Sequence, residues 1–167
     1  MTEKIYRSYL EIRSLSELKE VKKPAENYSV ELADPKDFQL NRFFYKTIGK
    51  NCQWIDRLVW TDLDWTKYVS DEKLFTYILK NKNEIGGYFE LLFNKDTKEA
   101  EIAYFGILEE YFGRKLGAYL LSEAIKFSFN LGSARVWVHT CSLDHKNALL
   151  NYQSRGMKIF KSETLIR

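Results

Sequence analysis

The chain has few of the residues that build structural metal sites. It contains two cysteines and two histidines in 167 residues. Cys52 and Cys141 are not in a C-x-x-C spacing, and only His139 and His145 could join them as ligands. The pattern therefore indicates no structural zinc or other metal. Isolated, reduced thiols are typical of cytoplasmic proteins, which predicts a cytoplasmic location.

Long apolar runs are also missing. Residues 1–10 include Glu3, Lys4 and Arg7, so they contain no unbroken apolar segment of a signal peptide. No later run approaches the ~18 apolar residues that a membrane-spanning helix needs. We therefore expect a soluble, unprocessed protein that has no membrane partner.

Neither sign of charge is in large excess. The chain has 26 basic and 23 acidic residues, which give a net charge of +3 and are scattered along the sequence. This favours a solvated surface of mixed charge and argues against nucleic acid as a partner. A content of 45% hydrophobic and 16% aromatic residues is sufficient for one well-filled core. The sequence predicts a single domain over residues 1–167, in which 1–27 form an N-terminal strand and loop extension.

The apolar pattern that follows contains both periods of regular structure. Strand-like segments, which alternate or are continuously apolar, are 5–12, 28–32, 74–80, 85–93, 99–108, 135–140 and 158–166. Segments with a helical stripe or helix-terminus signals are 34–49, 114–131 and 145–155. This mixture predicts an α/β (α+β) domain.

The segment 51–68 has no clean period and is rich in tryptophan. Two interpretations stay open. Its indoles could pack one or two short helices onto the core. Alternatively, they could wall an acceptor pocket that takes a cation or a planar group. The candidate substrate-binding residues are Tyr45, Trp54, Trp60, Trp65 and Tyr88.

A glycine-containing loop, Phe112 to Gly117, leads from the strand-like segment 99–108 into the long helix. Such a loop presents free backbone N–H groups at the positive end of the helix dipole, which suits a pyrophosphate. It satisfies neither the Rossmann nor the Walker pattern. The loop therefore predicts a phosphate-bearing cofactor without naming it.

Three motifs in this order resemble the GCN5-related N-acetyltransferase (GNAT) superfamily, from about residue 28 to the C-terminus. The loop partly matches [QR]-x-x-G-x-[GA]: Gly117 fits the last position, but Phe112 replaces Gln or Arg and Lys115 replaces the first motif glycine. Glu101 precedes the loop at the spacing of the general base in the histone-type members. The segment 148–157 is similar to A-x-x-x-Y-x-x-x-G-[FM], with Tyr152 at the position of the general acid. The span 135–145 also looks like a bacterial subgroup of the superfamily.

The resemblance implies a mixed, mostly antiparallel central sheet flanked by helices, with splayed central strands. It also implies an acyl-CoA-dependent N-acetyltransferase that moves an acetyl group from acetyl-CoA to a primary amine of a small molecule or peptide by direct attack. A catalytically silent, coenzyme A-binding module that acts as a sensor or interaction domain is the alternative. A homodimer is left open.

The resemblance further implies where the cofactor lies. The pyrophosphate would rest on the amides of 113–118, and a bulge in the central strand would expose a backbone N–H to the oxyanion in the region 106–108. The implied cofactor-binding residues are Phe105, Gly106, Ile107, Leu108, Phe112, Gly113, Arg114, Lys115, Leu116, Gly117, Ala118, His145, Ala148 and Tyr152.

Acetylation of an amine requires a base, because a free alkylamine has a pKa of about 10. Glu101 is the preferred base by motif position, and Glu90 on the neighbouring strand is the alternative; partial burial would raise the pKa of either. Tyr152 would protonate the leaving thiolate. His139 could relay protons or be a hydrogen-bonded structural residue. Strict strand alternation places on one face Glu101, Ala103, Phe105 and Ile107.

Overall fold

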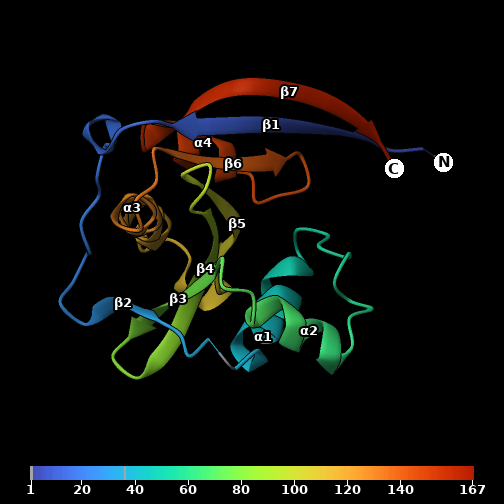
Figure 1. Ribbon diagram of the computed structural model, residues 1–167, viewed down its shortest axis with the longest axis horizontal. Helices are drawn as coiled ribbons and strands as arrows, with labels where there is room; N and C mark the ends of the chain where they lie inside the picture. Colours follow the sequence, from blue (N-terminus) through green and yellow to red (C-terminus); the bar gives the residue numbers. More distant parts are fainter. Residues whose placement is uncertain (1, 36) are drawn as a thin grey trace.

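A computed structural model describes residues 2–35 and 37–167 of the chain. Over this part, the centre of the molecule is a seven-stranded sheet with the order β2-β3-β4-β5-β6-β1-β7 (Figure 1). β5 and β6 pair in parallel, and every other neighbouring pair is antiparallel. The predicted mixed, mostly antiparallel sheet is confirmed.

The predicted elements are found with small shifts at their ends. The strands are β1 (Lys4–Ile12), β2 (Tyr28–Leu32), β3 (Leu74–Asn81), β4 (Glu84–Asn94), β5 (Glu99–Ile107), β6 (Arg135–Cys141) and β7 (Lys158–Ile166). The helices are α1 (Gln39–Gly49), α2 (Asp62–Val69), α3 (Leu116–Asn130) and α4 (Ala148–Ser154), with the short 3-10 turns η1 (Leu15–Glu17) and η2 (Glu109–Tyr111). The first helix begins later than its predicted start at 34, and residue 36 lies outside the described residues. None of the helices in the described part is long and apolar enough to cross a membrane.

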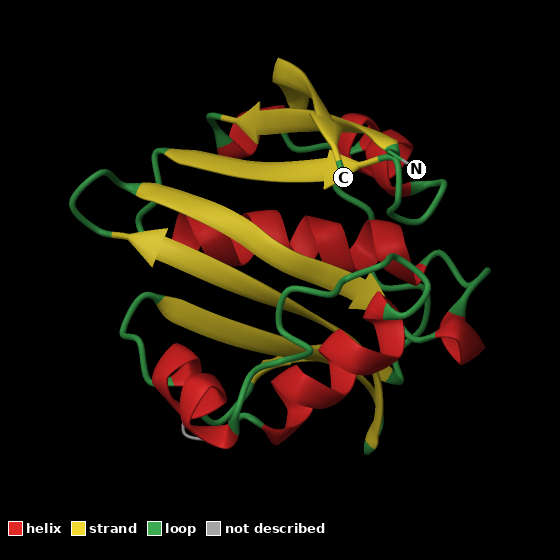
Figure 2. Ribbon diagram, turned by 90° about the vertical axis from the view of Figure 1, so that its right-hand side faces the viewer, coloured by secondary structure: helices red, strands yellow, loops and turns green. Residues whose placement is uncertain are grey.

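The helices cover the two faces of the sheet. α3 and α4 lie on one face, and α1 and α2 lie on the other (Figures 1 and 2). α3 buries Leu116, Leu120 and Ala124 in the same core as Phe89 and Leu91 of β4. Burial of these apolar side chains, which recur at helical spacing on α3 and alternate on β4, is what holds the helix to the sheet.

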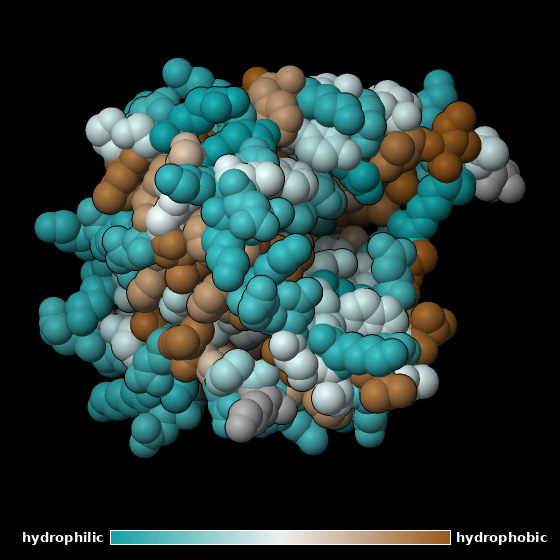
Figure 3. All heavy atoms as spheres, in the orientation of Figure 1, coloured by the Kyte–Doolittle hydropathy of each residue, from teal (hydrophilic) through white to brown (hydrophobic). Residues whose placement is uncertain are grey.

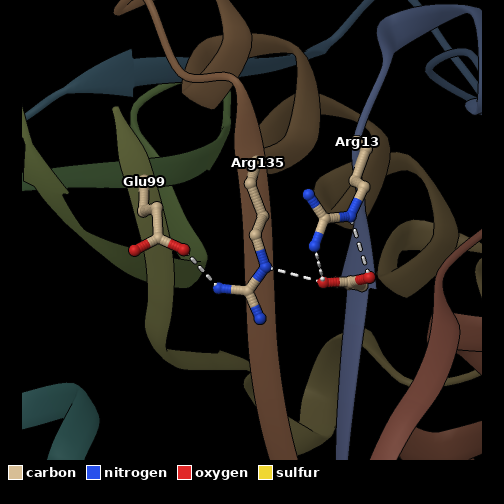
Figure 4. Close-up of polar contacts among 4 residues, drawn as sticks. Arg13, Glu99 and Arg135 are labelled. Atoms are coloured by element: carbon tan, nitrogen blue, oxygen red, sulfur yellow. Dashed lines mark hydrogen bonds and ion pairs between the residues drawn. The ribbon is translucent and has the colours of Figure 1, made fainter. Parts of the chain in front are cut away.

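β5 and β6 are joined at only one end. Their register covers Glu99–Glu101 of β5 against Arg135–Trp137 of β6, and no later residues of the two strands pair. At the joined end, Arg135 donates from Nη1 to Glu99 and from Nε to Glu11 of β1, both at 2.6 Å (Figure 4). Arg135 therefore ties β5 to β1 across β6, and the predicted splay of the central strands is confirmed beyond it.

A β-bulge interrupts β5 within the splay. Glu90 of β4 pairs with Tyr104, whereas the next β4 residue, Leu91, pairs with Ile102, so Ala103 is the extra residue. Directly paired residues share a face, which puts Glu101 on the face of Tyr104, towards α1. The predicted strict alternation of Glu101 with Phe105 was wrong for this reason, and the bulge lies at Ala103 rather than in the region 106–108.

Helix α1 approaches this face closely at Gly106. A Cβ at this position would lie 2.7 Å from Cγ2 of Ile48 on α1, so a larger residue would force Ile48 to move. The approach of α1 brings the loop that follows it, residues 50–61, beside β5. This loop forms one wall of the site described next.

Candidate functional site

A cleft of about 1530 Å³ opens where β5 and β6 diverge. Its walls come from β5, the end of β6, the first turn of α3, α4 and the loop after α1. Figure 3 shows the surface hollowed between the arm that carries both termini and the region of α1 and α2. The splay thus exposes the edge of β5, whose backbone groups beyond Glu101 have no partner strand on that side.

The N-terminus of α3 forms one end of the cleft and fits a pyrophosphate. Lys115 precedes the helix with φ 62° and ψ 17°, and its side chain makes no capping hydrogen bond. The first N–H groups of a helix have no intrahelical partner, and here they belong to cleft-lining residues, Leu116, Gly117 and Ala118. The first turn contains no acidic residue, so nothing in it repels an anion.

Lys115 occupies the left-handed region that the motif glycine would adopt without cost. This conformation costs a residue with a Cβ roughly 1–2 kcal/mol. Gly113 in the same loop also has a positive φ, 78°. The loop therefore keeps the backbone path of a glycine-rich cradle although one glycine has been replaced by lysine.

Arg114 lies outside this end of the cleft. Its guanidinium donates to the hydroxyl of Tyr28 at 3.4 Å and to the carbonyl of Glu110 at 3.2 Å, and it stacks over Tyr111. It is not among the lining residues, so these contacts give no support to the predicted contact with the cofactor.

Glu101 lies in the cleft wall near the joined end of the splay. Burial raises the pKa of its carboxyl group, and the positive charge of Arg57 acts in the opposite direction. No side chain within residues 2–35 and 37–167 makes a hydrogen bond or ion pair with Glu101, because Arg57 pairs with Glu90 instead. It is thus a half-buried carboxylate that is free to accept a proton.

Glu90, the alternative base, lies outside the cleft and is fully buried. Its carboxylate accepts hydrogen bonds from Arg57 Nη1 at 3.2 Å, Tyr68 at 2.6 Å and Asn41 at 2.7 Å. This carboxylate accepts from three donors and does not border the cleft, so it cannot take a proton from an amine that is bound in the cleft. The structure corrects the prediction for Glu90: its carboxylate holds Arg57 in place and does not serve as the base.

Tyr152 and His139 both border the cleft. Tyr152 is buried on α4 with its ring 6.3 Å from that of Phe105, and burial raises its pKa, so the phenol keeps its proton. His139 is exposed at the end of β6, with its ring 5.6 Å from that of Tyr9. Partial desolvation by the surrounding protein and, after it, the charge of Arg7 lower the pKa of the imidazole, which favours the neutral form.

A family model described as the acetyltransferase (GNAT) family matches residues 38–157, which is more than half of the chain. The chain belongs to this family. The match includes the central strand, the loop before α3 and most of the cleft. No curated protein matches this GNAT chain.

Solved structures share the GNAT fold at low sequence identity. A GCN5-related N-acetyltransferase from Sphaerobacter thermophilus has a TM-score of 0.66 at 15% identity, covering 97% of this chain and 50% of that one. An aminoglycoside acetyltransferase from an uncultured soil metagenomic sample has a TM-score of 0.63 at 15% identity, covering 77% and 87%. An IAA acetyltransferase from Bacillus cereus ATCC 14579 has a TM-score of 0.58 at 20% identity, covering 80% and 79%. This GNAT chain thus spans half of the Sphaerobacter chain, and the likeness is one of fold.

The aromatic residues predicted to bind substrate are divided by the GNAT fold. Trp54 borders the cleft, with its ring 4.8 Å from that of Tyr104. The others are not in the cleft wall: Tyr88 is fully buried with its ring 4.7 Å from that of Phe44. The remaining three surround the guanidinium of Arg57: Tyr45, Trp60 and Trp65. Core packing, the first of the two interpretations, describes Tyr45, Trp65 and Tyr88, which are buried, and Trp54 also packs against the core while it borders the cleft.

Arg57 is a site residue for which the sequence predicted no role. It is 7% exposed, and it borders the cleft beside Glu101. The only signal in the sequence is its place in the tryptophan-rich segment. No pattern within that segment predicts that Arg57 pairs with Glu90, which lies 33 positions away in the chain.

Both cysteines of this GNAT domain border the cleft. Burial raises the pKa of Cys52 to about 11, so its thiol is protonated near neutral pH and is a poor nucleophile. Among the described residues, no group of three or more His, Cys, Asp and Glu could hold a metal ion.

Proposed function

We propose that this GNAT domain is an N-acetyltransferase that moves an acetyl group from acetyl-CoA to a primary amine of a small molecule or peptide. One observation carries the proposal: a single cleft joins an uncapped helix N-terminus to a half-buried carboxylate with a raised pKa. The first suits a pyrophosphate and the second suits a general base. Their combination is what acetyl transfer to an amine requires.

The cofactor-binding residues follow from the cleft. The N–H groups of Leu116, Gly117 and Ala118 would hold the pyrophosphate, and the ammonium of Lys115 would add charge. The free edge of β5 from Phe105 onwards offers backbone groups to an extended pantetheine arm. His145 and Ala148 also line the cleft, and the ring of His145 lies 5.1 Å from that of Phe112. Acetyl-CoA, when bound, supplies the acyl group as an activated thioester.

Glu101 acts as the base of the proposed reaction. Its carboxylate accepts the proton that the amine nitrogen loses, directly or through one water molecule. Burial raises the pKa of Glu101, which brings it closer to that of the group it deprotonates. The amine attacks the thioester directly, so we assign no covalent step to the protein.

Tyr152 acts as the acid. Its raised pKa keeps the phenol protonated, so its hydroxyl can donate a proton to the sulfur that leaves. The packing of Phe105 against its ring orients the phenol with respect to β5. His139, neutral near pH 7, could pass protons between the cleft and solvent.

The test separates cofactor binding from turnover. Calorimetry with acetyl-CoA measures binding, and thiol release with a panel of primary amines measures transfer. We expect both, and we expect Glu101→Gln to lower kcat/KM by roughly 10²- to 10⁴-fold while cofactor binding persists. Glu72→Gln, an exposed glutamate away from the cleft, is the matched control and should keep full activity.

The alternative, a silent coenzyme A-binding module, makes a different prediction. It predicts that acetyl-CoA binds but that no amine in the panel is acetylated by the wild-type protein. Tyr152→Phe would then bind the cofactor as the wild type does, with no turnover in either. That result would overturn the enzymatic proposal.

A further inference from the structure

An arginine is fixed at the wall of the cleft by an aromatic cage. The guanidinium carbon of Arg57 lies 4.1 Å from the ring centroid of Tyr68, 4.2 Å from that of Tyr104 and 4.7 Å from that of Trp60. Its backbone N–H donates to the hydroxyl of Tyr45 at 3.0 Å. Cation–π contacts of this kind stabilise a desolvated guanidinium and restrict its orientation. Arg57 is therefore held in one position before any ligand binds.

The ion pair with Glu90 leaves donors of Arg57 available. Glu90 accepts from Nη1 alone, at 3.2 Å, and the Tyr68 hydroxyl, which donates to Glu90, is also a hydrogen-bond partner of the guanidinium. A guanidinium carries several N–H donors in a planar fork. Because the side chain borders the cleft and is 8% exposed, its accessible edge faces the cleft.

Arg57 and Glu101 are close enough to affect one another. The charge of Arg57 lowers the pKa of Glu101 against the effect of burial, and both side chains border the same cleft beside Tyr104. An acceptor whose amine lies at Glu101 thus occupies the same cleft as a fixed cation. A second arginine of the cleft wall, Arg7, has a buried Nε without a hydrogen-bond partner among the described residues.

On the basis of the proposed function, we propose that the acceptor carries a carboxylate as well as its amine, and that Arg57 binds this carboxylate. A carboxylate is the group that matches the planar fork of a guanidinium. The same cation disfavours acceptors with several positive charges. Aminoglycosides are polycations, so we expect them to be poorer acceptors in this cleft than a compound with one amine and one carboxylate.

The test compares acceptors that differ only in this group. α-, β- and γ-amino acids are each paired with the corresponding carboxamide, and the aminoglycoside sisomicin serves as a polycationic acceptor. Thiol release and mass spectrometry of the products give kcat/KM for each. A hydrogen bond to a charged group contributes about 1.5–3 kcal/mol, so the best acid should exceed its amide by roughly 10- to 150-fold.

A variant assigns the discrimination to Arg57. The double substitution Arg57→Met/Glu90→Gln removes both charges and leaves no buried charge unpaired. We expect kcat/KM for the acid to fall to that for its amide. Arg42→Met is the matched control, because Arg42 also has an ion pair and an aromatic contact but lies outside the cleft; it should preserve the ratio.

Each outcome decides the proposal. Amides acetylated as well as their acids, or sisomicin alone acetylated, would overturn it while leaving the proposed function in place. A double variant that slows acid and amide equally, so that their ratio is kept, would show that Arg57 has only a structural role. Binding of acetyl-CoA with no turnover of any amine would instead remove the proposed function itself.

Discussion

The ion pair of Arg57 and Glu90 is the most buried one among the described residues, and breaking it tests how the site is held. Glu90 is fully buried, and the side chain of Arg57 is 8% exposed. Arg57→Met leaves the carboxylate without a counter-charge, and removal of one partner of a buried pair costs about 3–5 kcal/mol. For a chain of this size, this corresponds to a fall in Tm of roughly 6–20 °C.

The two single variants should not be additive. Glu90→Gln also costs stability, because the aromatic cage then surrounds a cation that has lost its carboxylate. In Arg57→Met/Glu90→Gln neither charge remains, so the second substitution recovers part of the loss. We expect a coupling free energy of about 2 kcal/mol or more, measured by urea denaturation of the wild type, both single variants and the double variant. Tryptophan fluorescence is a suitable signal, because Trp60 and Trp65 contact Arg57.

An exposed pair provides the control for this cycle. Arg42 and Asp62 lie closer together, at 2.7 Å, but their side chains are 30% and 78% exposed. Solvent screening limits such pairs to about 1 kcal/mol or less, so the cycle Arg42→Met/Asp62→Asn should give a smaller coupling. If Arg57 and Glu90 show a coupling below about 0.5 kcal/mol, the argument that burial makes this pair matter is refuted.

Four further measurements test the site and its support. The kcat/KM for acetyl transfer should rise with pH as Glu101 loses its proton. The midpoint of this rise should lie above the ordinary carboxyl range, because burial raises the pKa of Glu101. Glu101→Gln should remove the rise; if the rise persists in this variant, another group is the base. Because the pKa of Glu101 is higher in the folded state than in the unfolded state, its side chain favours folding at a pH below the unfolded-state value. This contribution is lost as the pH rises through the folded-state value. Glu101→Gln should therefore stabilise the fold at pH 7 and not at pH 3. Lys115→Gly should raise the free energy of unfolding by about 1 kcal/mol, because glycine adopts the left-handed backbone conformation without strain. The same substitution should weaken binding of coenzyme A in calorimetry. Unchanged binding would show that the ammonium of Lys115 makes no contact with the cofactor. Arg135→Met removes both 2.6 Å contacts at the joined end of the splay. It should lower the free energy of unfolding by roughly 1–3 kcal/mol in urea denaturation. Lys126→Met, which breaks a more exposed ion pair, is the control and should lower the free energy of unfolding by less than about 1 kcal/mol.

The order of strands and helices could be predicted from the sequence because it depends on local periodicity. β7 occupies the predicted residues 158–166, and α3 lies within the predicted 114–131. Alternating and helical apolar patterns select one face of each element for burial, and the turn residues between them end each element. The loop before α3 was found for the same reason, since a strand, a glycine and a helix follow each other directly in the chain.

The bulge in β5 could not be predicted from alternation, because it depends on the register against β4. Ala103 has no partner of its own there, and this one residue moves Glu101 to the face of Tyr104. A period-of-two pattern carries no information about such an insertion. The sequence therefore singled out Glu101, which borders the cleft, but assigned it to the wrong face of β5.

What the sequence by itself determined is the family, the succession of elements and the motif positions of Glu101, Tyr152 and the glycine-containing loop before α3, since each depends on neighbours within a few residues. Only the tertiary structure decided which polar residues meet in the cleft. Glu90 was a candidate base until Arg57, Tyr68 and Asn41 were seen to enclose it. The physical reason is that burial and charge compensation depend on segments distant in the chain, and these contacts separate a carboxylate that can react from one that holds an arginine in place.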